Sequence, residues 1–135
     1  MKTLLTISFT ILLSMASTVH AAAPATTPEN ECEGGSNMEN AECVGTKLNI
    51  ADQELNATVN AIRARLAAAA KTDREAPEVD RRLLKSQQAW AAFRQADCSL
   101  EGAEMLGGNG EGARIQSCEL SKTLERLQQL SQIPF

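Results

Sequence analysis

The sequence predicts an all-α domain in which three helices follow one another in an up-down-up arrangement, with a long first helix and two disulfides. Three observations predict it. Apolar residues recur at steps of three and four along most of the chain, and no segment alternates strictly as a half-buried strand would. Four cysteines also lie in a chain of only 135 residues that begins like an exported protein.

Residues 1–21 have the pattern of a secretory signal peptide. Lys2 gives a positive start, an apolar run covers residues 4–15, and the Val-His-Ala that ends at Ala21 is a small-residue cleavage site. We expect cleavage after Ala21, with Ala23 as the alternative, and a periplasmic or secreted location. The run is shorter than the roughly 20 residues that a membrane span needs, so we expect no membrane association.

The mature chain divides into a short tether and one domain. Residues 22–31 are rich in Ala, Pro and Thr without apolar periodicity, and we interpret them as a flexible linker. Residues 32–135 have the size of a single domain. Loss of Lys2 with the leader leaves 12 of the 13 basic residues against 17 acidic ones, a net charge of −5. This balance is not typical of a nucleic-acid-binding protein.

The cysteines of an exported chain favour two disulfides. Four cysteines allow three pairings, and sequence locality favours Cys32–Cys43 and Cys98–Cys118. A zinc site with four thiolates is the rival interpretation. The spacing contains no C-x-x-C, and the one histidine, His20, lies in the leader. We therefore expect no metal and no cofactor.

The first helix is predicted from near Met38 to Lys71, because one apolar stripe continues over this whole segment. A helix of this length would extend roughly 50 Å at 1.5 Å per residue. The stripe consists of Cys43, Leu48, Ala51, Leu55, Val59, Ile62, Leu66 and Ala69.

The second helix is predicted to begin at Pro77, a favourable first-turn residue, and to continue to about Asp97. Trp90 and Phe93 lie on it and should supply most of the aromatic burial, because the chain has no Tyr. The next segment, residues 99–111, holds four glycines and is predicted to be a loop.

The third helix should begin near Gly112 and end before Pro134. Ile115, Leu120, Leu124, Leu127 and Leu130 fall on one side of it. The residues expected to form the centre of the core are Leu55, Trp90, Phe93 and Leu127.

Polar residues at helical spacing suggest a contact between the first two helices. Asp52 and Asn56 share one face, and Arg94 and Asp97 share another. In an antiparallel pair Arg94 would lie opposite the Asp52–Asn56 turn, so we expect an ion pair that fixes the helix register. The alternative is a carboxylate pair for glycoside hydrolysis, Asp52 with Glu54 or Asp97. No sugar-binding aromatic residues and no nucleophile–base pair accompany these carboxylates, so we do not expect an enzyme.

An ordered set of motifs carries a family resemblance over about residues 32–130. The set comprises Cys32 with Met38-Glu39-Asn40-Ala41-Glu42-Cys43, then Asp52-Gln53-Glu54-Leu55-Asn56, the segment from Leu84 to Cys98, Gly107-Gly108, Cys118, and Thr123-x-x-Arg126. In this order the motifs resemble the LprI-type lysozyme-inhibitor family, exported bacterial domains. The resemblance adds Thr123 and Arg126 to the expected structural polar residues, and it implies a protein that binds another protein.

The function expected from this resemblance is inhibition of a cell-wall muramidase by surface docking. Many lysozymes are cationic, and an acidic domain would associate with them faster. Glu101, Glu104 and Glu111, in the predicted glycine-rich loop, are the candidate contact residues. The alternative is a periplasmic accessory or immunity protein for another envelope protein. Oligomeric state does not follow from the sequence.

Overall fold

The computed structural model describes residues 30–133. The predicted signal peptide, the linker as far as residue 29, and Pro134 with Phe135 lie outside the described residues. Two short 3-10 turns, η1 (Asn30–Cys32) and η2 (Ala103–Met105), accompany the helices α1 (Asn37–Ala69), α2 (Ala76–Gly102) and α3 (Glu111–Ser131). Helices and turns account for all regular structure in residues 30–133, so the prediction of an all-α fold with three helices is confirmed.

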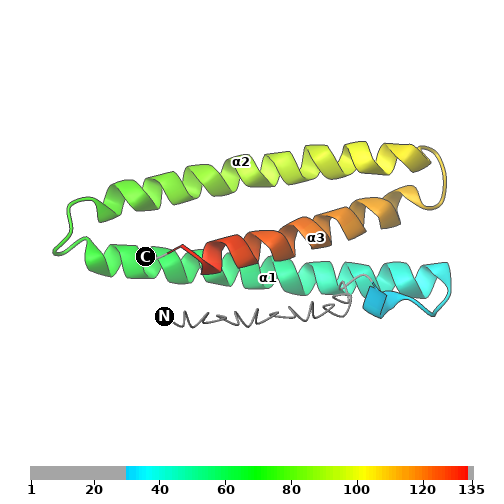
Figure 1. Ribbon diagram of the computed structural model, residues 1–135, viewed down its shortest axis with the longest axis horizontal. Helices are drawn as coiled ribbons and strands as arrows, with labels where there is room; N and C mark the ends of the chain where they lie inside the picture. Colours follow the sequence, from blue (N-terminus) through cyan, green and yellow to red (C-terminus); the bar gives the residue numbers. More distant parts are fainter. Residues whose placement is uncertain (1–29, 134–135) are drawn as a thin grey trace, which may run out of the picture.

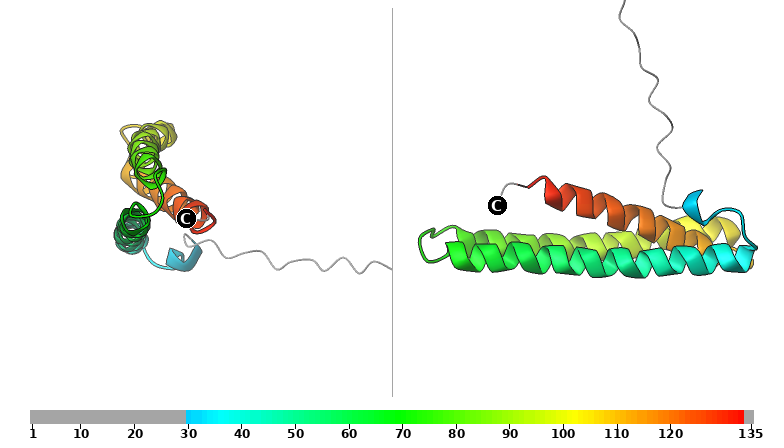
Figure 2. Two further views of the ribbon diagram at one scale, coloured as in Figure 1. Left: turned by 90° about the vertical axis from the view of Figure 1, so that its left-hand side faces the viewer. Right: turned by 90° about the horizontal axis from the view of Figure 1, so that it is seen from below.

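The three helices run up, down and up, as predicted (Figure 1). The hairpin between α1 and α2 closes one end of the molecule, and the loop between α2 and α3 lies at the other end. Two further views show α3 rising obliquely across the α1–α2 pair (Figure 2). No helix in the described part of the chain is long and apolar enough to cross a membrane.

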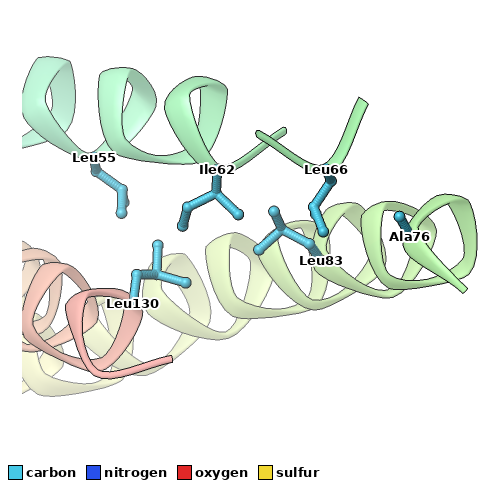
Figure 3. Close-up of a cluster of buried hydrophobic side chains, with 6 residues drawn as sticks. All are labelled: Leu55, Ile62, Leu66, Ala76, Leu83 and Leu130. Carbon is cyan, nitrogen blue, oxygen red and sulfur yellow. The ribbon is translucent and has the colours of Figure 1, made fainter. Parts of the chain in front are cut away.

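The core forms two clusters, one towards each end of the bundle. In the cluster near the hairpin, Leu55, Ile62 and Leu66 of α1 point towards Leu83 of α2 and Leu130 of α3 (Figure 3). Trp90 and Leu127 are partly buried and pack against this cluster. The second cluster joins η1, α1 and α3 and consists of Cys32, Val44, Ala51 and Leu120. The long first helix therefore contributes to both clusters.

Local chemistry explains where α1 and α2 begin. Ser36 caps α1: its Oγ accepts the Glu39 N–H at 3.3 Å, and Glu39 Oε2 accepts the Ser36 N–H at 2.8 Å. Pro77 lies in the first turn of α2, where its missing N–H costs nothing. The observed starts lie within one residue of the predicted ones, Met38 and Pro77.

The predicted end of α2 is wrong by five residues, because the helix continues from Asp97 to Gly102. The glycines suggested a loop from residue 99, but Gly102 has a packing role. A Cβ at Gly102 would lie 2.5 Å from Ile115 Cγ1, so the missing side chain lets α2 and α3 approach closely. The true connection is short, and Gly107 supplies its positive φ of 73°.

The prediction that Phe93 lies in the core is also wrong. Phe93 is 56% exposed, and Lys122 Nζ of α3 lies 5.3 Å from the centre of its ring. The inward positions of α2 include Leu83 and Cys98, both buried, with Trp90 between them. Phe93 is one turn from Trp90 but is rotated away from this line. Its ring therefore lies at the side of the bundle, and Trp90 is the main aromatic contribution to the core.

Candidate functional site

Arg94 joins all three helices through two hydrogen bonds. Its Nη1 donates to Asp52 Oδ1 of α1 at 2.5 Å and to Thr123 Oγ1 of α3 at 2.6 Å. Thr123 is fully buried. While its Oγ1 accepts from Arg94, its hydroxyl donates to the Glu119 carbonyl at 2.7 Å. The Arg94 guanidinium lies 5.0 Å from the centre of the Trp90 ring, and its Nε is buried without a hydrogen-bond partner. We call Asp52, Arg94 and Thr123 the Arg94 cluster.

The other polar residues predicted for this contact have separate partners. Asp97 pairs with Lys122 Nζ at 2.7 Å, and this hydrogen bond raises the pKa of Lys122. Arg126 Nε donates to Gln87 Oε1 at 2.6 Å, and burial lowers the pKa of Arg126. Asn56 is exposed on α1, outside the Arg94 cluster.

The pairing of Lys122 and Gln87 with residues on other helices was not predicted from the sequence, although the position of Gln87 gave an indication. It is a polar residue at a position where the inward-facing spacing of α2 calls for an apolar one, and such a position indicates a partner on a neighbouring helix. Lys122 gave no signal of this kind.

These polar groups hold helices together rather than present reactive atoms. Of the three carboxylates considered for glycoside hydrolysis, Asp52 and Asp97 each form an ion pair with a basic residue on another helix. Glu54 is exposed on α1. In the described residues no group of three or more His, Cys, Asp or Glu side chains could hold a metal ion. The geometry favours a structural role, in which paired charges fix the register of three packed helices.

Both disulfides cross-link elements at the loop end of the bundle. Cys32–Cys43 ties η1 to α1, and Cys98–Cys118 ties α2 to α3. These are the pairings favoured by sequence locality, and no described cysteine is free.

The folded chain separates its charges along the bundle. The acidic half, which we define as residues 30–54 and 97–119, carries eleven acidic and two basic residues, a net charge of −9. The basic half, residues 60–88, carries seven basic and four acidic residues, a net charge of +3. The loop between α2 and α3 belongs to the acidic half, and the α1–α2 hairpin belongs to the basic half (Figure 1).

An open groove of about 850 Å³ lies in the acidic half, between the start of α1 and the start of α3. Two methionines line it, Met38 at 81% exposed and Met105 at 49% exposed. Polar side chains also line the groove, among them Glu33, Asn37 and Asn109, together with Arg114, the one cation of its lining. We call this feature the methionine groove. Flexible thioethers beside amides and a carboxylate suit contact with another protein, because methionine side chains adapt to irregular surfaces.

The three glutamates predicted for a loop contact do not all lie in the loop. Glu101 is in the last turn of α2, with a carboxylate oxygen 3.7 Å from Arg114 Nη2. Glu111 begins α3 and accepts the Gly107 N–H at 3.2 Å, so it shapes the loop. Glu104 is exposed in η2. All three nevertheless belong to the acidic half.

Comparison with known proteins identifies the family. The model of the family "Lysozyme inhibitor LprI" matches residues 29–130. An uncharacterized protein of Rhizobium meliloti (strain 1021) is 31% identical over 121 residues, which cover 84% of this chain and 85% of that protein. No solved structure matches the chain. Since the family model covers almost the whole helical bundle, including both disulfides and the Arg94 cluster, the chain belongs to the lysozyme inhibitor LprI family.

Proposed function

We propose that this protein is exported, binds a cationic cell-wall lysozyme through its acidic half, and blocks that enzyme without chemistry of its own. Family membership supports the type of partner. The observation that carries the choice of surface is the charge separation, with −9 on one half of the bundle and +3 on the other.

Charge separation on this scale orients an approaching partner. A cationic protein is attracted to the acidic half and repelled from the basic half, so most encounters begin at the acidic half. Attraction of this kind raises the association rate and falls as salt screens it, over a length of about 8 Å at 0.15 M salt.

The methionine groove is the proposed point of contact within the acidic half. Met38 and Met105 can cover the alkyl chain of a lysine or arginine from the partner, while the Glu33 carboxylate lies in the same groove for its charged head. Arg114, the one cation that lines the groove, is paired with Glu101. Glu104 stands exposed in η2, directly before the glycine-rich loop. Glu101 and Glu111 complete the acidic surface and also stabilise the local structure through Arg114 and Gly107.

The direct test is inhibition of lysozyme activity on cell walls by the mature protein. We expect inhibition of at least one of the chicken-type, goose-type and invertebrate-type enzymes, with a weaker effect as salt rises. If the folded protein leaves all three fully active and captures none of them on a column, the proposal is wrong. Capture of a different envelope protein would then favour the accessory-protein alternative.

A matched pair of charge reversals tests the choice of surface. Glu104→Arg in the acidic half and Glu75→Arg in the basic half change the net charge equally, and both glutamates are exposed. We expect Glu104→Arg to weaken inhibition by about tenfold and Glu75→Arg to change it by less than about twofold. Equal effects would show that only the overall charge matters and that the acidic half is not the contact surface.

A further inference from the structure

The two methionines that lie outside the predicted leader both line the methionine groove. Met38 belongs to α1 and Met105 to η2, and their side chains are 81% and 49% exposed. The start of α1 and the connection between α2 and α3 lie at the same end of the bundle (Figure 1). The other methionines, Met1 and Met15, belong to the predicted leader. Folding therefore gathers the thioethers of residues 22–135 in one groove.

Few other side chains of the protein compete with these thioethers for an oxidant. All four cysteines are paired in disulfides, the chain has no Tyr, and its one histidine, His20, lies in the predicted leader. Trp90 is half-buried, with the Arg94 guanidinium 5.0 Å from the centre of its ring. Oxidation of a side chain follows its exposure and its nucleophilicity, so a two-electron oxidant reaches Met38 and Met105 first.

Met105 also supports the connection between α2 and α3. A Cβ at Gly110 would lie 2.6 Å from Met105 Sδ, so the sulfur packs directly against the backbone of Gly110. The Met105 carbonyl accepts the Gly108 N–H at 2.8 Å. Residues 106–110 are therefore folded around Met105. A polar oxygen on this sulfur would need water at a place where the loop now packs.

We propose that Met38 and Met105 form an oxidation site, at which a hypohalous acid converts both thioethers to sulfoxides, loosens the loop of residues 106–110 and weakens binding at the methionine groove. The sulfur lone pair attacks the oxygen of hypochlorous acid, so a sulfur–oxygen bond forms and the oxygen–chlorine bond breaks. Sulfur loses two electrons, chlorine leaves as chloride, and the proton of the acid passes to water. The weakened binding rests on the proposed function, whereas the modification and the loosened loop do not.

The two sulfoxides act on different parts of the groove. On Met38, oxidation replaces a flexible apolar side chain by a polar one, which no longer covers an alkyl chain from the partner. On Met105, oxidation also removes the packing of the sulfur against Gly110. Reductases return methionine sulfoxide to the thioether, so the oxidation site is a reversible switch.

Mass spectrometry of the mature protein, titrated with hypochlorous acid, tests the modification. We expect one oxygen on Met38 first, then one on Met105, which is less exposed, and oxidation of Trp90 last. Oxidation of Trp90 before either methionine overturns the proposal.

Amide hydrogen exchange measured by NMR tests the loop. The Gly107 and Gly108 amides both donate hydrogen bonds, to Glu111 Oε2 and to the Met105 carbonyl. We expect both to exchange at least about fivefold faster once Met105 is oxidised, and at the original rate while only Met38 is oxidised. Unchanged exchange after oxidation of Met105 overturns the proposal.

Inhibition of lysozyme before and after oxidation, with the oxidant removed before the assay, tests the effect on binding. We expect the parent to bind about tenfold more weakly once both methionines are oxidised. In Met38→Leu/Met105→Leu the thioethers are absent, so the oxidant should not change whatever inhibition this variant shows. Adding Ile133→Met to this variant places one thioether after the end of α3, at a residue that is 40% exposed, and controls for oxidation elsewhere.

The outcomes separate this proposal from the proposed function. A parent that inhibits equally before and after oxidation of both methionines overturns the oxidation site. An equal loss in Met38→Leu/Met105→Leu, with or without Ile133→Met, also overturns it, because the target is then another residue. If the untreated parent inhibits no lysozyme, the proposed function fails, while the order of oxidation and the exchange rates still test the modification and the loop.

Discussion

Arg94 shows how one side chain can set the register of a small bundle. Its guanidinium touches Asp52 on α1 and Thr123 on α3, while its own backbone belongs to α2. The side chain is only 18% exposed. Removal of one member therefore leaves a largely buried polar group without its partner, and that penalty exceeds the net value of the pair.

We predict that Arg94→Ala lowers the free energy of unfolding by about 1–3 kcal/mol, after allowing for the partial exposure of Asp52. Arg65→Ala, an exposed arginine on α1, should cost less than about 0.5 kcal/mol. Urea unfolding of both variants measures the difference. Equal small losses would mean that Arg94 contributes no more to the free energy of unfolding than an exposed arginine does.

Gly102 offers a second test at a single position, with its control in the next helix. A Cβ at Gly102 would lie 2.5 Å from Ile115 Cγ1, whereas one at Gly112 would meet nothing within 4 Å. We predict that Gly102→Ala destabilises the domain by about 1–3 kcal/mol. Gly112→Ala should be neutral or stabilising by up to about 1 kcal/mol. Thermal melting should therefore give a lower melting temperature for Gly102→Ala and an unchanged or higher one for Gly112→Ala.

The contact between Asp52 and Arg94 was predictable because their positions could be counted along two helices, whereas the position of Phe93 depends on the rotation of its helix. The Asp52–Arg94 pair is present, and it follows from antiparallel helices of similar length. Phe93 was misplaced because three residues turn a helix by about 300°, so a neighbour of Trp90 can face outwards. The exact rotation is set by α3, whose path the sequence does not reveal.

The start of α1 depends on pH through its capping glutamate. Hydrogen bonds from Ser36, first from its backbone N–H, lower the pKa of Glu39 from its ordinary value of 4.5. A carboxyl group whose pKa is lower in the folded state stabilises the fold above its unfolded pKa, and this contribution is lost as pH falls through the folded value. The stabilisation is therefore present at neutral pH and disappears in acid.

We predict that Glu39→Gln is less stable than the parent at pH 7 and that the difference shrinks below about pH 4.5. The measurement is thermal unfolding at a series of pH values. Glu42→Gln removes a charge from an exposed residue one turn later and controls for the change in net charge. A difference between parent and Glu39→Gln that is independent of pH would contradict the prediction.

Helix starts were more predictable than helix ends for a physical reason. A capping residue or a proline acts locally, so Ser36 and Pro77 define their helices without help from the rest of the fold. The end of α2 depends on tertiary packing instead. Gly102 normally signals a break, but here its small size allows the contact with Ile115.

The two disulfides should differ in their effect on the whole domain. Cys98–Cys118 joins two long helices, and Cys98 is fully buried. Cys32–Cys43 holds a short turn against α1. We predict that the Cys98→Ser/Cys118→Ser variant loses about 2–4 kcal/mol and unfolds at a clearly lower temperature.

The Cys32→Ser/Cys43→Ser variant should lose less, because the α1–α3 packing of Ala51 and Leu120 remains. Calorimetry of the two variants compares them directly. A larger loss from the first pair of cysteines than from the second would contradict this ranking.

The charge separation could not be read from composition. The chain holds 13 basic and 17 acidic residues, which gives a formal net charge of only −4. The acidic half becomes visible when the α1–α2 hairpin brings residues 30–54 beside residues 97–119, which lie far apart in the sequence. The methionine groove has the same origin, since Met38 and Met105 line one groove only after the chain folds back.

Separated charge gives the molecule a permanent electric dipole along its long axis. On an anion-exchange resin the mature protein should therefore adsorb end-on, and it should elute later than its net charge of −5, from 12 basic and 17 acidic residues, suggests. Glu104→Gln and Glu75→Gln each remove one negative charge, one from either end. We expect the first to elute earlier by a larger margin, because only the acidic end faces the resin. Identical elution of the two variants would mean that the resin senses total charge and no orientation.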